Sequence, residues 1–272
     1  DDKQKSSPKR QKKTKNKFDI FILVYILLYM ETEEQLSIDE RNFIVDQAEC
    51  IIDQIYVHRP LKKAMHAVDP IQSLRLLRNN IKELSEREFH DEMLFIFVNL
   101  RDLHTQYCLP EPWKNYVAFL PFMIEAYYEN NNIKYMISKV FPDFNHSEFK
   151  RGSVITYWNG VPIEKVVEIN SYRTGGSNKD ARIARGIDAL TIRSLANNFV
   201  PDEHWVNINY VSEEGVSHEI KMDWKVDFTD YATISSYFKN TNGENGLSSG
   251  MDLKGEQVRN IKSFCGGPGG GF

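Results

Sequence analysis

The stretch FIFVNLRDLHTQYCLP, Phe95 to Pro110, ends an apolar run with a histidine, His104, where the chain is expected to turn. Histidine is the side chain whose ordinary pKa lets it take and return a proton near neutral pH, so His104 is a candidate general base. Such a base acts on a serine hydroxyl within hydrogen-bond reach. Asp102 is not expected to orient it, because side chains two positions apart on a helix do not face each other. The structural alternative is a partly buried histidine whose positive charge stabilises a helix end.

Helices are expected to lead up to this histidine. Capping boxes begin at Ser37 and Ser85, and apolar residues at helical spacing follow both. The first helix is expected over 38–56, and the helix after Ser85 runs toward the histidine. An aspartate followed by Pro70 predicts a helix between these two. The sequence therefore predicts a helical domain over 37–113.

Strand-like patterns begin at Tyr116. The runs VAFLPFMIEAYY and IKYMISKVF are joined by ENNN, which tolerates left-handed turns and predicts a hairpin. Asn159-Gly160 predicts a turn before a helix that starts near Pro162. Residues 181–198 have a helical pattern, and WVNINYV with HEIKMDW predicts a closing hairpin. The expected fold class is α+β, with the helical domain followed by a strand-rich domain over 114–226 that contains a helical insertion.

The two ends of the chain differ in composition from the rest. Residues 1–36 are first basic and then hydrophobic, as in a secretory signal or anchor. The apolar run at 18–30 is shorter than the roughly 17 to 25 residues of a confident membrane span, and Met30 opens a stretch typical of an ordinary amino terminus, so the first segment is alternatively non-native. Membrane attachment or export is expected if 18–30 is native, and a cytoplasmic location otherwise. Residues 227–272 are expected to form a flexible tail, because their polar, glycine-rich composition buries little apolar area.

Composition and charge exclude several classes of function. The chain has 272 residues, 41% hydrophobic and 26% charged, which is globular and long enough for two modest cores. A net charge of -4 gives no overall attraction to nucleic acid. Cys50, Cys108 and Cys265 are widely spaced, and the sequence has no paired Cys/His spacing and no H-E-x-x-H. No disulfide framework, metal or other cofactor is expected.

Five stretches in this order resemble a known family. LRDLHTQYCLP, LPFMIE, GSVITYWNGVPIEKVVE, GSNKDARIARGIDALTIRSL and PDEHWVNINYV are similar to the amino-terminal half of the tail-specific, or C-terminal-processing, serine peptidases, which include the tricorn core protease. The resemblance covers roughly Ser37 to Val226. It implies that the strand-rich region is a PDZ-like domain.

The resemblance implies a fragment of a serine endopeptidase, a hydrolase that cleaves peptide bonds without a metal. His104 matches the general base that the tricorn-type branch places just before its PDZ-like domain, although Leu103 stands where that branch has a serine. The nucleophile serine belongs to a later domain of the family, which this sequence does not contain. The fragment alone is therefore expected to be inactive.

PDZ-like domains bind an extended peptide at a sheet edge beside a helix. If the strand SVITYWNG and the following helix form this groove, Val154, Ile155, Tyr157 and Trp158 are candidate lining residues, and the alternative is that they are strand core. The expected partners are polypeptide substrates or peptide C-termini. The alternative function is a non-enzymatic, PDZ-like peptide-binding module on the same scaffold.

Overall fold

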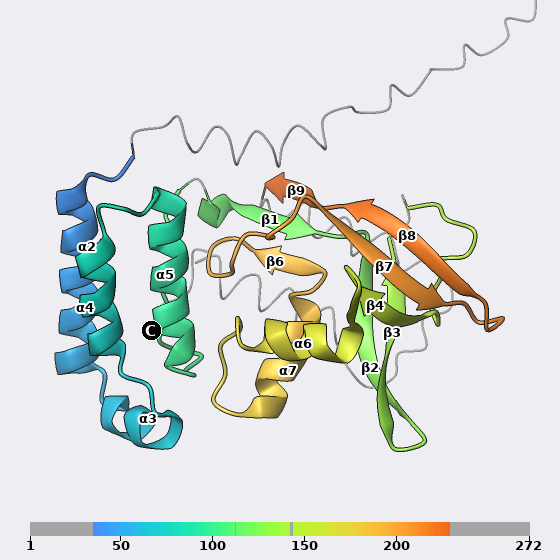
Figure 1. The fold of residues 1–272 in the computed structure, drawn as a ribbon, viewed down its shortest axis with the longest axis horizontal. Coiled ribbons are helices and arrows are strands. Elements are labelled where there is room, and N and C mark those ends of the chain that lie inside the picture. The colour runs from blue at the N-terminus through green and yellow to red at the C-terminus, as the bar shows by residue number, and fades with distance from the viewer. Residues whose placement is uncertain (1–34, 112, 142–143, 229–272) are drawn as a thin grey trace, which may run out of the picture.

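A computed structural model describes residues 35–111, 113–141 and 144–228. A helical half lies beside a strand-rich half, and the chain passes from the first to the second near Trp113 (Figure 1). This arrangement confirms the α+β fold class predicted from the sequence. The apolar and basic run at the amino terminus, and most of the predicted tail, lie outside the described residues.

The helical half has four α-helices and one π-helical turn within the described residues. They are α2 (Ile38–Cys50), η1 (Ile51–Ile55), α3 (Arg59–His66), α4 (Pro70–Asn80) and α5 (Glu86–Asn99). Both predicted capping boxes form, at Ser37 and at Ser85, and Asp69 caps α4. The first helix, predicted over 38–56, is observed as α2 continued by η1. The short helix α3 was not predicted.

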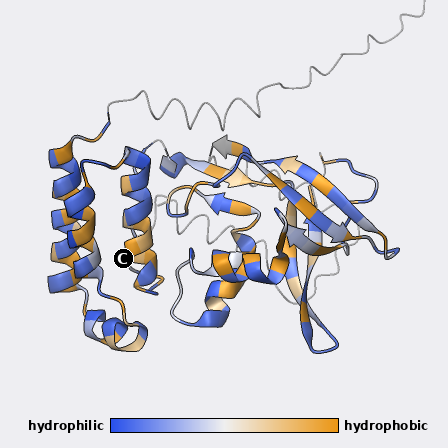
Figure 2. Cartoon of the chain, viewed as in Figure 1, coloured by the Kyte–Doolittle hydropathy of each residue, from blue (hydrophilic) through white to orange (hydrophobic). Residues whose placement is uncertain are grey.

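One face of each long helix supplies the core of this half. In Figure 2 the hydrophobic faces of α2, α4 and α5 turn toward one another. The fully buried side chains include Val45, Ile52, Leu74, Phe89 and Met93. Burying side chains of this size is the main stabilising term for such a bundle. It fixes the orientation of α5, which carries the chain to His104.

The strand-rich half contains two antiparallel sheets. The larger has the order β2-β3-β4-β7-β8, with β5 paired to β4, and the smaller has the order β6-β1-β9. The larger sheet is made of β2 (Phe122–Glu129), β3 (Asn132–Val140), β4 (Val154–Trp158), β5 (Val161–Pro162), β7 (Trp205–Val211) and β8 (Ser217–Asp223). The smaller sheet is made of β1 (Tyr116–Phe119), β6 (Ile192–Ser194) and β9 (Lys225–Phe228), and a 3-10 turn, η2 (Trp113–Asn115), precedes it.

The predicted turns form where asparagine and glycine adopt left-handed conformations. Asn130 and Asn131 have φ of 49° and 63° and join β2 to β3. Asn159 and Gly160 have φ of 50° and 77° and lead from β4 into β5. These residue types adopt such angles at lower cost than others. Both turn predictions, and the closing hairpin of β7 and β8, are confirmed.

Two helices lie between β5 and β6. They are α6 (Ile163–Ser171), which starts after Pro162 as predicted, and α7 (Lys179–Asp188). The prediction of a helix over 181–198 is wrong in its second half, because α7 ends at Asp188 and β6 pairs with β1. Pairing with a neighbouring strand outweighs the weak local helix preference there.

The strand β9 continues to Phe228 and pairs with β1, so the first two residues of the segment predicted as a flexible tail, 227–272, belong to a strand. Within the described residues, no helix is both long and apolar enough to cross a membrane. The run at 18–30, on which the membrane prediction depends, lies outside them.

Candidate active site

His104 lies on a turn that follows α5. The helix ends at Asn99, where Leu100 donates its N–H to the carbonyl of Phe97 and Arg101 donates its N–H to the carbonyl of Val98. Arg101 follows in a left-handed conformation, with φ of 52°, which stops the helix. The assumption that Asp102 and His104 share a helix, which excluded their pairing, is therefore wrong.

Asp102 holds this turn together from a half-buried position. Its Oδ1 accepts the backbone N–H of His104 at 2.9 Å, and its Oδ2 accepts the hydroxyl of Tyr56 at 2.8 Å. Burial raises the pKa of Asp102, but these two hydrogen bonds and the charge of Lys62 outweigh burial and lower it overall. Burial and the Asp102 carboxylate raise the pKa of Tyr56, so that hydroxyl stays a donor. Asp102 is thus a carboxylate held in one orientation.

The ring of His104 remains open to solvent, since its side chain is 91% exposed. Its Nδ1 lies 3.8 Å from Oδ1 of Asp102. A carboxylate on this side favours a proton on Nδ1 and leaves the lone pair of Nε2 free to accept one. The geometry is therefore suited to proton transfer at Nε2.

The other end of the turn is anchored by aromatic packing. The Tyr107 hydroxyl lies 2.7 Å from Nδ1 of His90, and the two rings stack with centroids 5.9 Å apart. The ring of Trp113 also packs edge-on against the ring of His90, with centroids 5.2 Å apart. Burial and the charge of Arg41 lower the pKa of His90 to about 4, so it is neutral and its Nδ1 can accept the tyrosine proton.

The loop between α6 and α7 faces this turn from the strand-rich half. Gly176 has φ of 144°, and a Cβ placed there would lie 3.0 Å from a terminal nitrogen of Arg185. A Cβ at Gly175 would lie 3.5 Å from the carbonyl oxygen of Asp102. The loop backbone therefore approaches the His104 turn closely, and Gly176 has a conformation that other residues rarely adopt.

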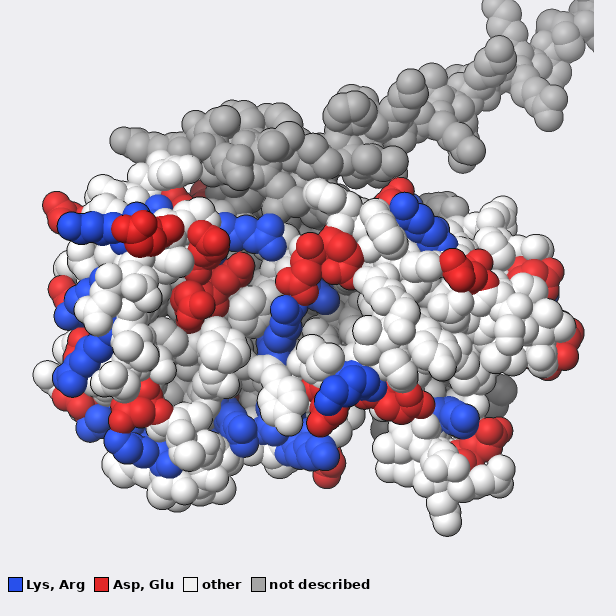
Figure 3. Space-filling model, in the orientation of Figure 1, with Lys and Arg blue, Asp and Glu red and all other residues white. Residues whose placement is uncertain are grey.

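Residues of the turn and of this loop together line two adjoining cavities. The one beside His104 has a volume of about 410 Å³, and the other, of about 130 Å³, lies between α5, α7 and β6. Asp102, Leu103 and Arg185 line both. In Figure 3, Lys and Arg side chains gather between the two halves in the lower part of the view. We name the larger cavity the His104 cleft.

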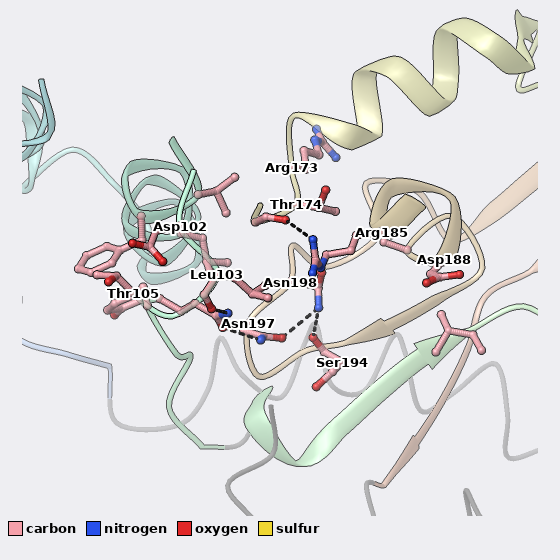
Figure 4. Close-up of a pocket in the computed structure, with 18 residues that line it drawn as sticks. Asp102, Leu103, Thr105, Arg173, Thr174, Arg185, Asp188, Ser194, Asn197 and Asn198 are labelled. Carbon is pink, nitrogen blue, oxygen red and sulfur yellow. Dashed lines mark hydrogen bonds between the residues drawn. The ribbon is translucent and has the colours of Figure 1, made fainter. Parts of the chain in front are cut away.

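Figure 4 shows the smaller cavity, with Asp102 and Leu103 on one side and Arg185 on the other. Side-chain amides of the lining form hydrogen bonds: Asn197 donates to the side chain of Gln106 at 3.0 Å, and Asn198 donates to the carbonyl of Ser194 at 3.0 Å. These bonds join the His104 turn to the segment after β6. The cavity is therefore built from both halves of the molecule.

The four predicted peptide-lining residues lie in β4, away from both cavities. Ile155 and Trp158 are buried in the core, with exposures of 1% and 5%, whereas Tyr157 is 45% exposed. Val154 is half-buried. β4 pairs with β3 and β5 on one side and with β7 on the other, so neither of its edges is free along its whole length.

The larger sheet ends instead at β2 and β8. Among the described strands, β2 pairs only with β3, and α7 packs against β2. An unpaired strand edge beside a helix is the geometry in which an extended peptide can add to a sheet. Sequence reasoning missed this edge because strand order depends on pairing between residues far apart in the chain.

Sequence reasoning also missed Tyr56, Lys62 and Arg185 as neighbours of His104. Tyr56 follows the first helix, Lys62 is on the unpredicted α3, and Arg185 is on α7. No local pattern connects them with the turn. Among the described residues, no group of three or more His, Cys, Asp or Glu side chains could hold a metal ion.

Comparison with known proteins identifies the strand-rich half. The family profile for the PDZ domain matches residues 116–237. The region is thus a PDZ domain that follows a helical region. No curated protein sequence matches the chain.

Solved structures of CPAF share this fold. The crystal structure of mature CPAF superposes with a TM-score of 0.58 at 14% identity, covering 77% of this chain and 38% of that chain. Mature CPAF complexed with lactacystin gives a TM-score of 0.56 at 14% identity, covering 77% and 39%. A mutant form of CPAF gives 0.56 at 13% identity, covering 75% and 39%. This chain thus spans well under half of the CPAF chains it resembles, and the likeness extends beyond the PDZ domain.

Proposed function

We propose that this chain is the helical and PDZ portion of a serine endopeptidase of the tail-specific type, in the tricorn-core-like branch, and that His104 is its general base. The observation that carries the proposal is the exposed His104 ring at the cleft, with Nδ1 turned toward the Asp102 carboxylate. The similarity of LRDLHTQYCLP and the following stretches to that family supports it. The nucleophile serine comes from a part of the protein beyond this sequence.

The chemistry follows from the orientation of the ring. Nε2 of His104 takes the proton of the serine hydroxyl as that oxygen attacks the peptide carbonyl, and later returns it to the leaving amine. Asp102 stabilises the ring with a proton on Nδ1 and stays ionised while the ring becomes an imidazolium. Tyr56 keeps the carboxylate in place. Leu103 then lines the cleft without taking part in proton transfer.

The PDZ domain would select polypeptide ends for this site. The free edge of β2 beside α7 is the place where an extended peptide would add to the sheet. The four residues predicted in β4 would then support the groove from the core rather than contact the peptide, with Tyr157 as the exposed exception. The second candidate function, a peptide-binding module without catalysis, rests on this same edge.

The test is labelling by a serine-directed fluorophosphonate probe. The 272-residue chain is expected to stay unlabelled, and a version extended by its native downstream sequence is expected to be labelled. His104→Ala in the extended version should reduce the labelling rate by about a hundredfold or more, since general-base catalysis contributes roughly 10² to 10⁴.

His204→Ala is the matched control, because His204 is an exposed histidine of the PDZ half that lines neither cavity. Equal labelling rates of the His104→Ala and His204→Ala proteins would refute the assignment of His104 as the general base. Peptide binding without labelling in the extended protein would favour the binding module.

A further inference from the structure

The short helix α3 is amphipathic, and its polar side is tied to the rest of the protein. The polar side chains recur at the spacing of one helical stripe and are Arg59, Lys62, Lys63 and His66. Arg59 and Lys63 form ion pairs with Asp53 and Asp69. Lys62 donates to the carbonyl of Arg101, whose guanidinium contacts Nδ1 of His66. A helix on a protein surface ordinarily has the opposite orientation, with its polar side in water.

The apolar side of α3 is left in solvent. Pro60, Leu61, Ala64 and Met65 form two pairs at a spacing of four residues, and all four are exposed. Leu61 is 54% exposed and Met65 is 63% exposed, while Val57, just before the helix, is 80% exposed. No residue of α3 is buried. The helix therefore presents an apolar surface that the described part of the chain does not cover.

The segment that contains this helix is basic. From Gln54 to Val68 the sequence has no acidic residue, although the net charge of the chain is -4. The acidic residues at the two ends of the segment, Asp53 and Asp69, already form the ion pairs named above. Lys62 forms no ion pair among the described residues. An exposed apolar stripe on a basic helix is typical of helices that lie in the interface of an anionic bilayer.

A second exposed apolar site lies on the same side of the molecule. The tip of the β2–β3 hairpin and α3 both reach the lower end of the view in Figure 1. Near this tip Tyr128 is 77% exposed, and its partner across the two strands, Ile133, is 40% exposed. A tyrosine has an apolar ring and a polar hydroxyl, which suits the boundary between lipid and water. Two protrusions on one side of a molecule are able to contact one flat surface together.

We propose that α3 binds the surface of an anionic lipid bilayer, with Leu61 and Met65 inserted between the headgroups and the β2–β3 tip as a second contact. Insertion removes the two side chains from water, and the positive charge of the segment adds an attraction to the lipid phosphates that salt screens. A bilayer is favoured over a protein partner because the exposed apolar residues come from two separate elements that reach the same side of the molecule.

The test is amide hydrogen exchange of the 272-residue chain, measured by mass spectrometry with and without lipid vesicles. Vesicles of phosphatidylcholine with about one third phosphatidylserine should slow exchange in peptides that cover 57–66 and 128–133. Vesicles of phosphatidylcholine alone should slow it less, and added salt should weaken the effect of the anionic vesicles. Exchange is measured segment by segment because the apolar run at 18–30 is able to bind lipid by itself.

The double variant Leu61→Gln/Met65→Gln should raise the lipid concentration that half-protects α3 by about tenfold or more, since burial of large aliphatic side chains changes an equilibrium constant by at least that factor. Both side chains are exposed, so the substitutions leave the core intact. The matched control Ile169→Gln/Val216→Gln replaces two apolar residues of other elements, 49% and 52% exposed, and should leave that concentration unchanged.

Two results would overturn the proposal. One is unchanged exchange of 57–66 when anionic vesicles are added to the native chain, which would leave the apolar side of α3 as a surface for a protein partner. The other is equal protection of α3 in the native chain and in the Leu61→Gln/Met65→Gln variant at every lipid concentration.

Discussion

Protonation of His90 is expected to destabilise the fold at acidic pH. The ring is 2% exposed and lies between Phe89, Tyr107 and Trp113. Nε2 has no hydrogen-bond partner in the part of the chain that the structure describes, and the carboxylate of Glu86 lies 3.7 Å from it. That carboxylate favours the protonated ring, but it already accepts a backbone N–H, and burial is the larger effect.

The size of the effect follows from the pKa of His90 in the folded protein. That pKa is lowered from 6.5 to about 4, and each unit corresponds to about 1.4 kcal/mol, so the free energy involved is about 3 kcal/mol. The unfolded chain binds the His90 proton near pH 6.5, whereas the folded protein binds it only near pH 4. The stability is fully present above pH 6.5, declines as the pH falls, and is lost below about pH 4.

The test is urea unfolding at a series of pH values between 7.5 and 4. It measures the free energy of unfolding of the native chain and of His90→Gln. Glutamine does not titrate and can still accept the Tyr107 hydroxyl. The free energy of unfolding of the native chain should fall by about 3 kcal/mol more than that of the variant over this range. Other groups, such as the neighbouring Asp91, titrate in both proteins and cancel in the comparison.

The reasoning is refuted if the two proteins lose stability in parallel between pH 7.5 and 4. It is equally refuted if the proton resonances of the His90 ring titrate near pH 6.5 in the folded protein. In either case, burial would not control the charge of this ring.

Two further predictions concern the turn and the loop that faces it. Asp102→Asn should slow fluorophosphonate labelling of the extended protein by about tenfold or more, because a carboxylate beside Nδ1 of His104 selects the reactive form of the ring. Asp102→Glu should recover part of the rate. The labelling rates of both variants are compared with that of the native protein. Gly176→Ala should lower the free energy of unfolding by about 1 to 2 kcal/mol, since φ is 144° and the methyl group would lie 3.0 Å from Arg185, whereas an unchanged urea midpoint would contradict the strain.

Most elements of the fold could be predicted because their signals are local. The capping boxes at Ser37 and Ser85 and the turn at Asn159 act within a few residues, and each forms as expected. The error at 189–198 has the opposite cause, since β6 exists only through its pairing with β1. Helix spacing in the sequence could not reveal that partner.

The candidate site was predictable only in part, for the same physical reason. His104 could be singled out by its residue type and by its place at the end of an apolar run. Its neighbours Tyr56, Lys62 and Arg185 come from three separate elements, and the fold of both halves decides that they meet. The exclusion of Asp102 failed because the helix was expected to extend past Arg101, which instead adopts a left-handed conformation.

The contacts of the turn argue against the purely structural interpretation of His104. A histidine that stabilises a helix end would lie in the last turn of α5, near its free carbonyls. His104 lies five residues beyond Asn99, and its backbone N–H is bound to Asp102. Both ends of the turn are anchored, at Tyr56 and at His90, while the ring between them is 91% exposed. Packing does not require such a ring, but a proton acceptor has to be both oriented and accessible.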